Sequence, residues 1–188
     1  MSEIILYPTE TIYGLGVNAF DETARAALAA LKGRKAGQIV SLLVRDRADI
    51  ERYAVVTPQA SKLIDTYLPG SLTIGLEPLN SVPQWFRVLQ PLISFRISPD
   101  PVAKSLIAEY MNKNGGVPLT CTSANVHGLP ALATPEAILR QFGDRADMIT
   151  NVVDDGPREG VSSTVVECVA GAVTIIREGA ITIDPDLP

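Results

Sequence analysis

The chain has 188 residues, 16 basic and 21 acidic side chains, and a formal net charge of −5. Its hydrophobic share of 46% is ordinary for a globular protein and too high for a disordered one, and the length is enough to bury a substantial core. The acidic balance argues against a general nucleic-acid coat, because phosphate contacts made by basic residues dominate that affinity.

Strands and helices are predicted to alternate along most of the chain. An apolar run over 4–7 predicts a buried strand, which Pro8 ends. Asp21 can cap a helix, and Thr57 and Thr134 each precede a proline suited to the first helical position. The predicted helices cover 22–31, 58–68, 101–111 and 135–142, and the predicted strands cover 4–7, 39–44, 72–76, 92–97, 117–121, 148–153, 163–169 and 172–177. Because the C-terminal strands follow one another closely, we expect an α/β fold with a mixed sheet.

Apolar runs, cysteines and histidine narrow the class of protein further. No apolar run approaches the length of a membrane span, and the N-terminus, Met1 to Glu3, lacks the basic flank of a signal peptide. Cys121 and Cys168 predict two buried free thiols in a reducing cytoplasm. The single histidine, His127, has no histidine partner for a metal site. We expect one cytoplasmic domain over 1–188 with no membrane contact.

Five loops or element ends are dense in hydroxyl groups, glycines and cations, which often bind ligands at strand ends of α/β folds. The loop over 7–16 is either a ligand loop or an ordinary turn with capping threonines. Lys32 and Arg34, at the end of the first predicted helix, either offset its dipole or clamp a phosphate. Arg96 lies within an apolar strand, so it requires an internal carboxylate or an anionic ligand.

Two later loops carry similar side chains. The segment 120–125 places hydroxyl and amide groups just beyond a predicted strand, and their density favours a binding site over a capped turn. The segment 154–164 and Arg177, at the end of the last strand, suit a structural or a functional role equally. The sequence has no standard phosphate loop, and the glycines of 14–16 do not complete a dinucleotide fingerprint.

Taken together, these segments resemble the YrdC/Sua5 family of L-threonylcarbamoyladenylate synthases. The matching pieces lie in the family's order and span about residues 4 to 183. They are Pro8-Thr9-Glu10-Thr11-Ile12-Tyr13-Gly14-Leu15-Gly16, Lys32-Gly33-Arg34, Pro69-Gly70-Ser71-Leu72-Thr73, Phe95-Arg96-Ile97, Thr122-Ser123-Ala124-Asn125, Ser163-Thr164-Val165-Val166 and Ile176-Arg177-Glu178-Gly179-Ala180-Ile181. The first and fifth pieces are the specific ones.

The resemblance implies both a fold and a reaction. The fold is the YrdC-like twisted mixed sheet with flanking helices and a concave ligand-binding surface. The reaction, a nucleotidyl transfer, combines L-threonine, bicarbonate and ATP, with Mg²⁺, into threonylcarbamoyl-AMP and pyrophosphate. A tRNA threonylcarbamoyl transferase is then the expected partner. It receives the product and modifies adenosine 37 of tRNAs that read ANN codons, so weak tRNA contact is also expected.

The family motifs assign roles to individual side chains. The residues implied for threonine are Thr9, Arg96 and Ser163. The residues implied for the nucleotide are Lys32, Arg34, Gln38, Ser123, Asn125 and Arg177. Lys32 and Arg34 are the catalytic pair among them, and no residue is assigned to a metal.

The chain also departs from the family pattern. Gln38 stands where relatives have a different polar contact after the lysine-glycine-arginine run, Ser71 replaces the second proline of a Pro-Gly-Pro step, and the usual preceding helix is not seen. Two rival functions therefore stay open. One is a non-catalytic RNA- or nucleotide-binding paralogue of the same fold. The other is an enzyme related to carbamoyltransferases, which use carbamoyl phosphate.

Overall fold

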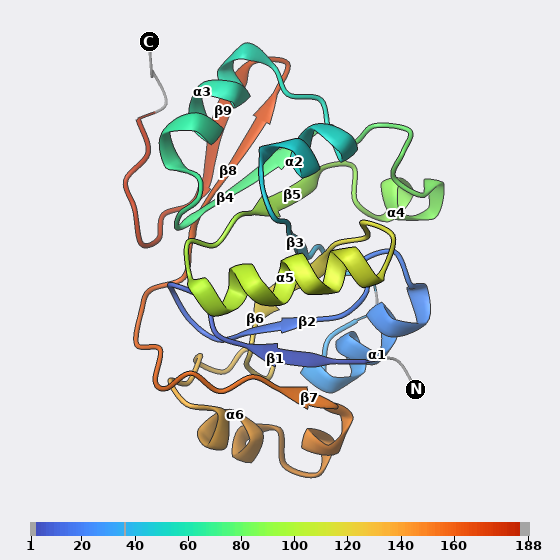
Figure 1. Cartoon of the computed structure of the whole chain (residues 1–188), viewed down its shortest axis with the longest axis vertical. Coiled ribbons are helices and arrows are strands. Elements are labelled where there is room, and N and C mark those ends of the chain that lie inside the picture. Colours follow the sequence, from blue (N-terminus) through green and yellow to red (C-terminus); the bar gives the residue numbers. More distant parts are fainter. Residues whose placement is uncertain (1–2, 36, 185–188) are drawn as a thin grey trace.

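A nine-stranded mixed sheet runs through the described part of this computed structural model, residues 3–35 and 37–184 (Figure 1). The strand order is β7-β1-β2-β6-β3-β5-β4-β8-β9. The strands are β1 (Ile5–Tyr7), β2 (Gly14–Gly16), β3 (Ser41–Leu43), β4 (Leu72–Leu76), β5 (Ile93–Arg96), β6 (Leu119–Ser123), β7 (Asn151–Val152), β8 (Thr164–Val169) and β9 (Ala172–Arg177). The pairs β1–β7, β3–β5 and β4–β8 are parallel and the others antiparallel, which confirms the predicted mixed α/β sheet.

The predicted helices and their caps are confirmed. The helices are α1 (Glu22–Lys32), α2 (Arg47–Tyr53), α3 (Pro58–Tyr67), α4 (Gln84–Leu89), α5 (Pro101–Lys113) and α6 (Pro135–Phe142), followed by the 3₁₀ helix η1 (Gly143–Met148). The side chains of Asp21, Thr57 and Thr134 each accept a hydrogen bond from a backbone N–H of the first turn. No helix in the described part is long and apolar enough to cross a membrane.

Several elements differ from the sequence prediction. Strand β2 lies in a segment expected to be a loop. The segment can pair with β1 because its glycines leave room for the ring of Tyr7. A Cβ on Gly14 would stand 3.0 Å from Cζ of that ring. Helices α2 and α4 were not predicted, and the strand expected over 148–153 shrinks to β7 because Met148 belongs to η1.

Helices cover both faces of the sheet. Helix α5 packs its apolar side on Ile5 and Tyr7, whereas α1 and α6 pack on Leu6, which points to the opposite face of β1. A third cluster joins α2, α3 and α4 to strands β3, β4, β5 and β8. Both cysteines, Cys121 and Cys168, are buried free thiols, as predicted.

Candidate functional site

A cavity of about 550 Å³ lies against the central strands, with the loop between β1 and β2 at its edge. Its lining mixes polar and apolar side chains, and several polar ones reach it because alternate residues of each strand face the same side. Strand β5, for example, sends Ile93 and Phe95 into the core and Ser94 and Arg96 to the cavity. Further hydroxyl groups reach the same space from Ser41, Thr73, Thr122, Ser123, Ser162 and Ser163. Such a lining suits a small, polar ligand that makes many hydrogen bonds.

The three residues expected to bind threonine all line this cavity: Thr9, Arg96 and Ser163. The Arg96 side chain is only 7% exposed and forms an ion pair with Glu10. Its Nη2 also donates to Oγ1 of Thr11 at 3.3 Å, but its buried Nε has no hydrogen-bond partner. Arg96 therefore has an internal carboxylate, one of the two alternatives left open by the sequence, and still keeps one buried N–H group unsatisfied.

Glu10 holds this arginine in place, and sequence reasoning gave it no role. Its Oε1 pairs with Arg96 and accepts a hydrogen bond from Oγ of Ser71 at 3.4 Å, while its Oε2 accepts one from Oγ of Ser98. Burial lowers the pKa of Arg96, but the neighbouring Cys121 and Glu10 groups more than offset this, so its pKa is raised overall. The guanidinium thus stays charged despite its burial.

The hydroxyl groups of Thr9 and Ser163 are already engaged. Oγ1 of Thr9 donates to the carbonyl of Ile12 at 2.6 Å and accepts from the backbone N–H of Thr11 at 3.2 Å, so it shapes the loop. Oγ of Ser163 shares a hydrogen bond with Oγ1 of Thr73 at 2.7 Å. The carbonyl of Ser163 accepts from Nη2 of Arg177 at 2.8 Å. Partial removal from water, and then the charge of Arg96, lower the pKa of Arg177.

The residues expected to bind the nucleotide divide into two groups. Ser123 and Arg177 line the cavity, whereas Lys32, Arg34, Gln38 and Asn125 are not part of its lining. Lys32 is 3% exposed, and its Nζ donates to the carbonyls of Ser123 and Asn125, the latter at 2.9 Å. Oγ of Ser123 donates to Oδ1 of Asn125 at 2.5 Å. Lys32 therefore ties the end of α1 to the loop after β6.

Arg34 lies in a cluster of cations beside that loop. Its buried Nε has no partner, and neither has the buried Nη1 of Arg25, which stacks on the Phe86 ring at 4.5 Å. Arg25, Arg34 and Gln38 line a second, much smaller hollow. Burial lowers the pKa of both arginines, and the charge of Arg34 contributes to lowering that of Arg25 to about 10. In the described part of the chain no carboxylate pairs with Arg25, Lys32 or Arg34, which favours an anionic ligand.

Comparison with known proteins identifies the family of the chain. The sequence profile of the Sua5/YciO/YrdC family, which carries the description telomere recombination, matches residues 1–179. The chain belongs to this family. A putative threonylcarbamoyl-AMP synthase of Methanocaldococcus jannaschii is 34% identical over 96% of this chain and 82% of that protein. The threonylcarbamoyl-AMP synthase of Bacillus subtilis is 31% identical over 96% of this chain and 51% of that protein.

A solved structure of the Sua5/YciO/YrdC family supports the same fold. The crystal structure of P. abyssi Sua5 complexed with L-threonine has a TM-score of 0.80 and 28% identity to this chain. The matched region covers 94% of this chain and 50% of the Sua5 chain. The chain therefore spans about half the length of the P. abyssi and B. subtilis proteins.

Lys32 makes the stability of this Sua5/YciO/YrdC protein depend on pH. Burial, and then the charge of Arg34, lower the pKa of Lys32 from 10.5 to about 7. Between these values the unfolded chain binds a proton at Lys32 that the folded chain does not bind. The free energy of unfolding should therefore rise with pH across this window, by up to about 1.4 kcal/mol per pH unit.

Lys32→Met should remove that rise. Urea unfolding of both proteins between about pH 7 and about pH 10 measures the difference in slope. A variant whose free energy of unfolding follows the same pH dependence as the wild type would show that Lys32 keeps its proton when folded.

No group of three or more histidine, cysteine, aspartate or glutamate side chains in 3–35 and 37–184 is arranged to hold a metal ion. The polar side chains that line the cavity are mainly hydroxyl groups and cations, and Glu167 is the single carboxylate among the lining residues. This donor set does not suit a resident divalent cation, for which carboxylate oxygens are the usual protein ligands.

Proposed function

We propose that the chain is a threonylcarbamoyl-AMP synthase, a nucleotidyltransferase that acts on L-threonine, bicarbonate and ATP. The observation that carries the proposal is the convergence of Thr9, Arg96 and Ser163 on one cavity. The named relatives and the threonine complex of P. abyssi Sua5 support the same activity. We further propose that the chain works as one domain, because its described strands all belong to one sheet.

Threonine occupies the Arg96 end of the cavity in this proposal. The guanidinium, oriented by Glu10, binds the substrate carboxylate. The pair of hydroxyl groups on Thr73 and Ser163 offers both a donor and an acceptor for the polar groups of the amino acid. The Thr9 turn closes this end of the cavity, and its own hydroxyl shapes the loop.

ATP binds from Ser123 and Arg177 toward the cation cluster. Ser123, Asn125, Gln38 and Arg177 contact the nucleotide, and Lys32 and Arg34 neutralise its phosphates. An adjacent phosphate raises the pKa of a lysine, so bound ATP would keep Lys32 charged near neutral pH. Mg²⁺ enters with ATP as its phosphate complex rather than on a carboxylate cluster of the protein.

The chemistry fits this division of the site. The threonine amine forms a carbamate with the carbon dioxide of bicarbonate, and the proton that the amine loses leaves with the released hydroxide as water. A carbamate oxygen attacks the α-phosphorus of ATP, and the bond to the leaving pyrophosphate breaks. Such a step depends on positioning and charge neutralisation, which arginine, lysine and hydroxyl groups supply.

The product determines the partners that we propose. Threonylcarbamoyl-AMP is a reactive mixed anhydride, so it passes to a tRNA threonylcarbamoyl transferase in the cytoplasm, with weak tRNA contact at most. The alternative, a non-catalytic RNA- or nucleotide-binding paralogue, is less well supported because the described relatives carry synthase names.

Pyrophosphate release from Mg-ATP tests the proposal, with threonine and bicarbonate each omitted in turn. We expect release only when both are present. Carbamoyl phosphate in place of threonine and bicarbonate serves as a control for the related carbamoyltransferase chemistry. Folded protein that binds ATP but releases no pyrophosphate under any combination would favour the non-catalytic alternative.

A further inference from the structure

The connection between β7 and β8 forms one wall of the cavity. It crosses from one end of the sheet to a strand beside β4 and delivers Ser162 and Ser163 to the lining (Figure 1). On the way it presses against the β1–β2 loop, where the backbone N–H of Gly160 donates to the carbonyl of Thr11 at 3.0 Å. A Cβ on Gly160 would lie 2.3 Å from that oxygen, so this approach requires glycine.

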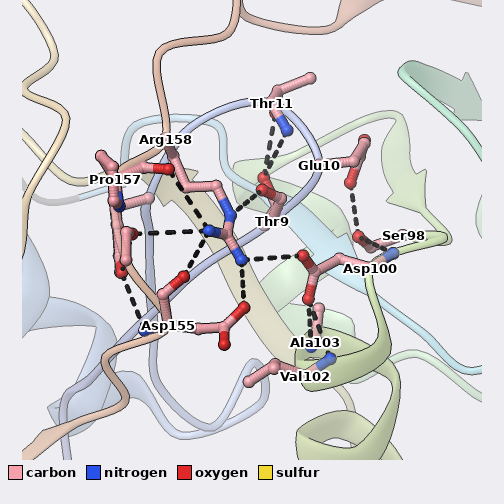
Figure 2. A network of polar contacts seen from close by, with 12 residues as sticks. Thr9, Glu10, Thr11, Ser98, Asp100, Val102, Ala103, Asp155, Pro157 and Arg158 are labelled. Carbon is pink, nitrogen blue, oxygen red and sulfur yellow. Dashed lines mark hydrogen bonds and ion pairs between the residues drawn. The ribbon is translucent and has the colours of Figure 1, made fainter.

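Arg158 fastens this crossover to the rest of the site (Figure 2). Its Nε donates to the carbonyl of Thr9 at 3.1 Å. Its Nη2 pairs with Asp100 at 3.1 Å and with Asp155 at 2.5 Å, and its Nη1 donates to the carbonyl of Asp155 at 2.6 Å. The Arg158 side chain is 17% exposed and that of Asp100 is 9% exposed, so this pair is largely shielded from water, whereas Asp155 is 50% exposed.

The contacts of Arg158 continue to the threonine end of the cavity. Asp100 caps helix α5 with Oδ1 and offers Oδ2 to Arg158. The backbone N–H of Asp100 donates to Oγ of Ser98 at 3.2 Å, and Ser98 in turn donates to Glu10. Glu10 holds Arg96. A continuous chain of polar contacts therefore runs from Arg158 to the guanidinium in the cavity.

We propose that Arg158 is a positioning residue for the amino-acid end of the cavity, acting through the Thr9 carbonyl and through the Asp100–Ser98–Glu10 contacts on Arg96. Arg158 does not line the cavity, so it acts without touching the ligand. The inference rests on the proposed function, since the amino acid at that end is threonine.

The planar fork of arginine is essential to this role. One guanidinium reaches a carbonyl and two carboxylates in different directions, whereas a lysine ammonium concentrates its donors at one point. Arg158→Lys should therefore keep the charge beside the carboxylates but lose the simultaneous link to Thr9. Arg158→Met removes both the charge and the link.

Steady-state pyrophosphate release tests the inference, with threonine and ATP varied separately. We expect Arg158→Met to raise KM for threonine by roughly tenfold and Arg158→Lys to raise it less, with KM for ATP changed by no more than about twofold. Arg47→Met is the matched control, because Arg47 also bridges two carboxylates but lies on α2, away from the cavity. The control should leave both KM values unchanged.

A double-mutant cycle separates positioning from simple destabilisation. Asp100→Asn keeps an oxygen for the α5 cap and removes the charge that faces Arg158, so its effect on KM for threonine should not add to that of Arg158→Lys. Equal increases in both KM values, or an unchanged KM for threonine in folded Arg158→Lys, would overturn the inference alone. A wild type without threonine-dependent release would overturn it together with the proposed function.

Discussion

Arg96→Met is expected to lower kcat/KM for threonine by roughly thirtyfold to a few thousandfold. The side chain is 7% exposed and is proposed to pair with the threonine carboxylate, and truncating one partner of a buried charge pair between a protein and its ligand typically costs about 2–5 kcal/mol. At about 1.4 kcal/mol for each factor of ten, that cost gives the expected range. Pyrophosphate release at saturating ATP measures the loss, and titration calorimetry with threonine measures the binding component.

A double variant separates ligand binding from folding. Arg96→Met leaves the Glu10 carboxylate without its main partner, so the single variant should also unfold at a lower temperature. Adding Glu10→Gln removes the stranded charge and should recover much of that stability without recovering activity. If the double variant also regained threonine turnover, the arginine would serve only to neutralise Glu10.

Local signals in the sequence predicted most of the fold. The caps at Asp21, Thr57 and Thr134 act on the first turn of their own helices, so the pattern alone identified them. Strand β2 was missed because its two glycines signal a turn when read locally. The glycines are needed there because Tyr7, which pairs with Gly14 from strand β1, places its ring against Gly14 and leaves no room for a side chain.

The short helices escaped prediction for a different reason. Helix α2 has seven residues and α4 has six, too few for an apolar period to repeat. Helix α4 has no side-chain cap, and it is held instead by Phe86, which is fully buried in the core. Tertiary packing therefore determines this element.

The family motifs named Thr9, Arg96 and Ser163, and the fold brings these three residues to one cavity. The motifs did not show what holds them there. The Glu10–Arg96 pair joins residues 86 positions apart, and the Asp100–Arg158 pair joins residues 58 positions apart. No local pattern encodes such contacts, so the supporting residues became visible only in the folded chain.

Arg34→Ala is expected to lower kcat/KM for ATP by at least about a hundredfold, with little change in KM for threonine. The Nε of Arg34 is buried without a partner in a cation cluster that no described carboxylate neutralises. Charge neutralisation by such an arginine contributes strongly to the transition state of phosphoryl-centre attack. Lys35→Ala is the matched control, because Lys35 is the exposed neighbour in the same loop.

Comparing Arg34→Ala with Lys32→Met should show which of the two cations binds the phosphates of ATP. Lys32 already donates to the carbonyls of Ser123 and Asn125, so its loss should loosen the loop after β6 and lower ATP affinity. The Nε of Arg34 makes no hydrogen bond within the protein. Loss of this side chain should therefore reduce ATP turnover while the unfolding temperature changes little. Near-normal ATP kinetics in Arg34→Ala would remove the phosphate role from this residue and leave Lys32 and Arg25 as the remaining cations of the cluster.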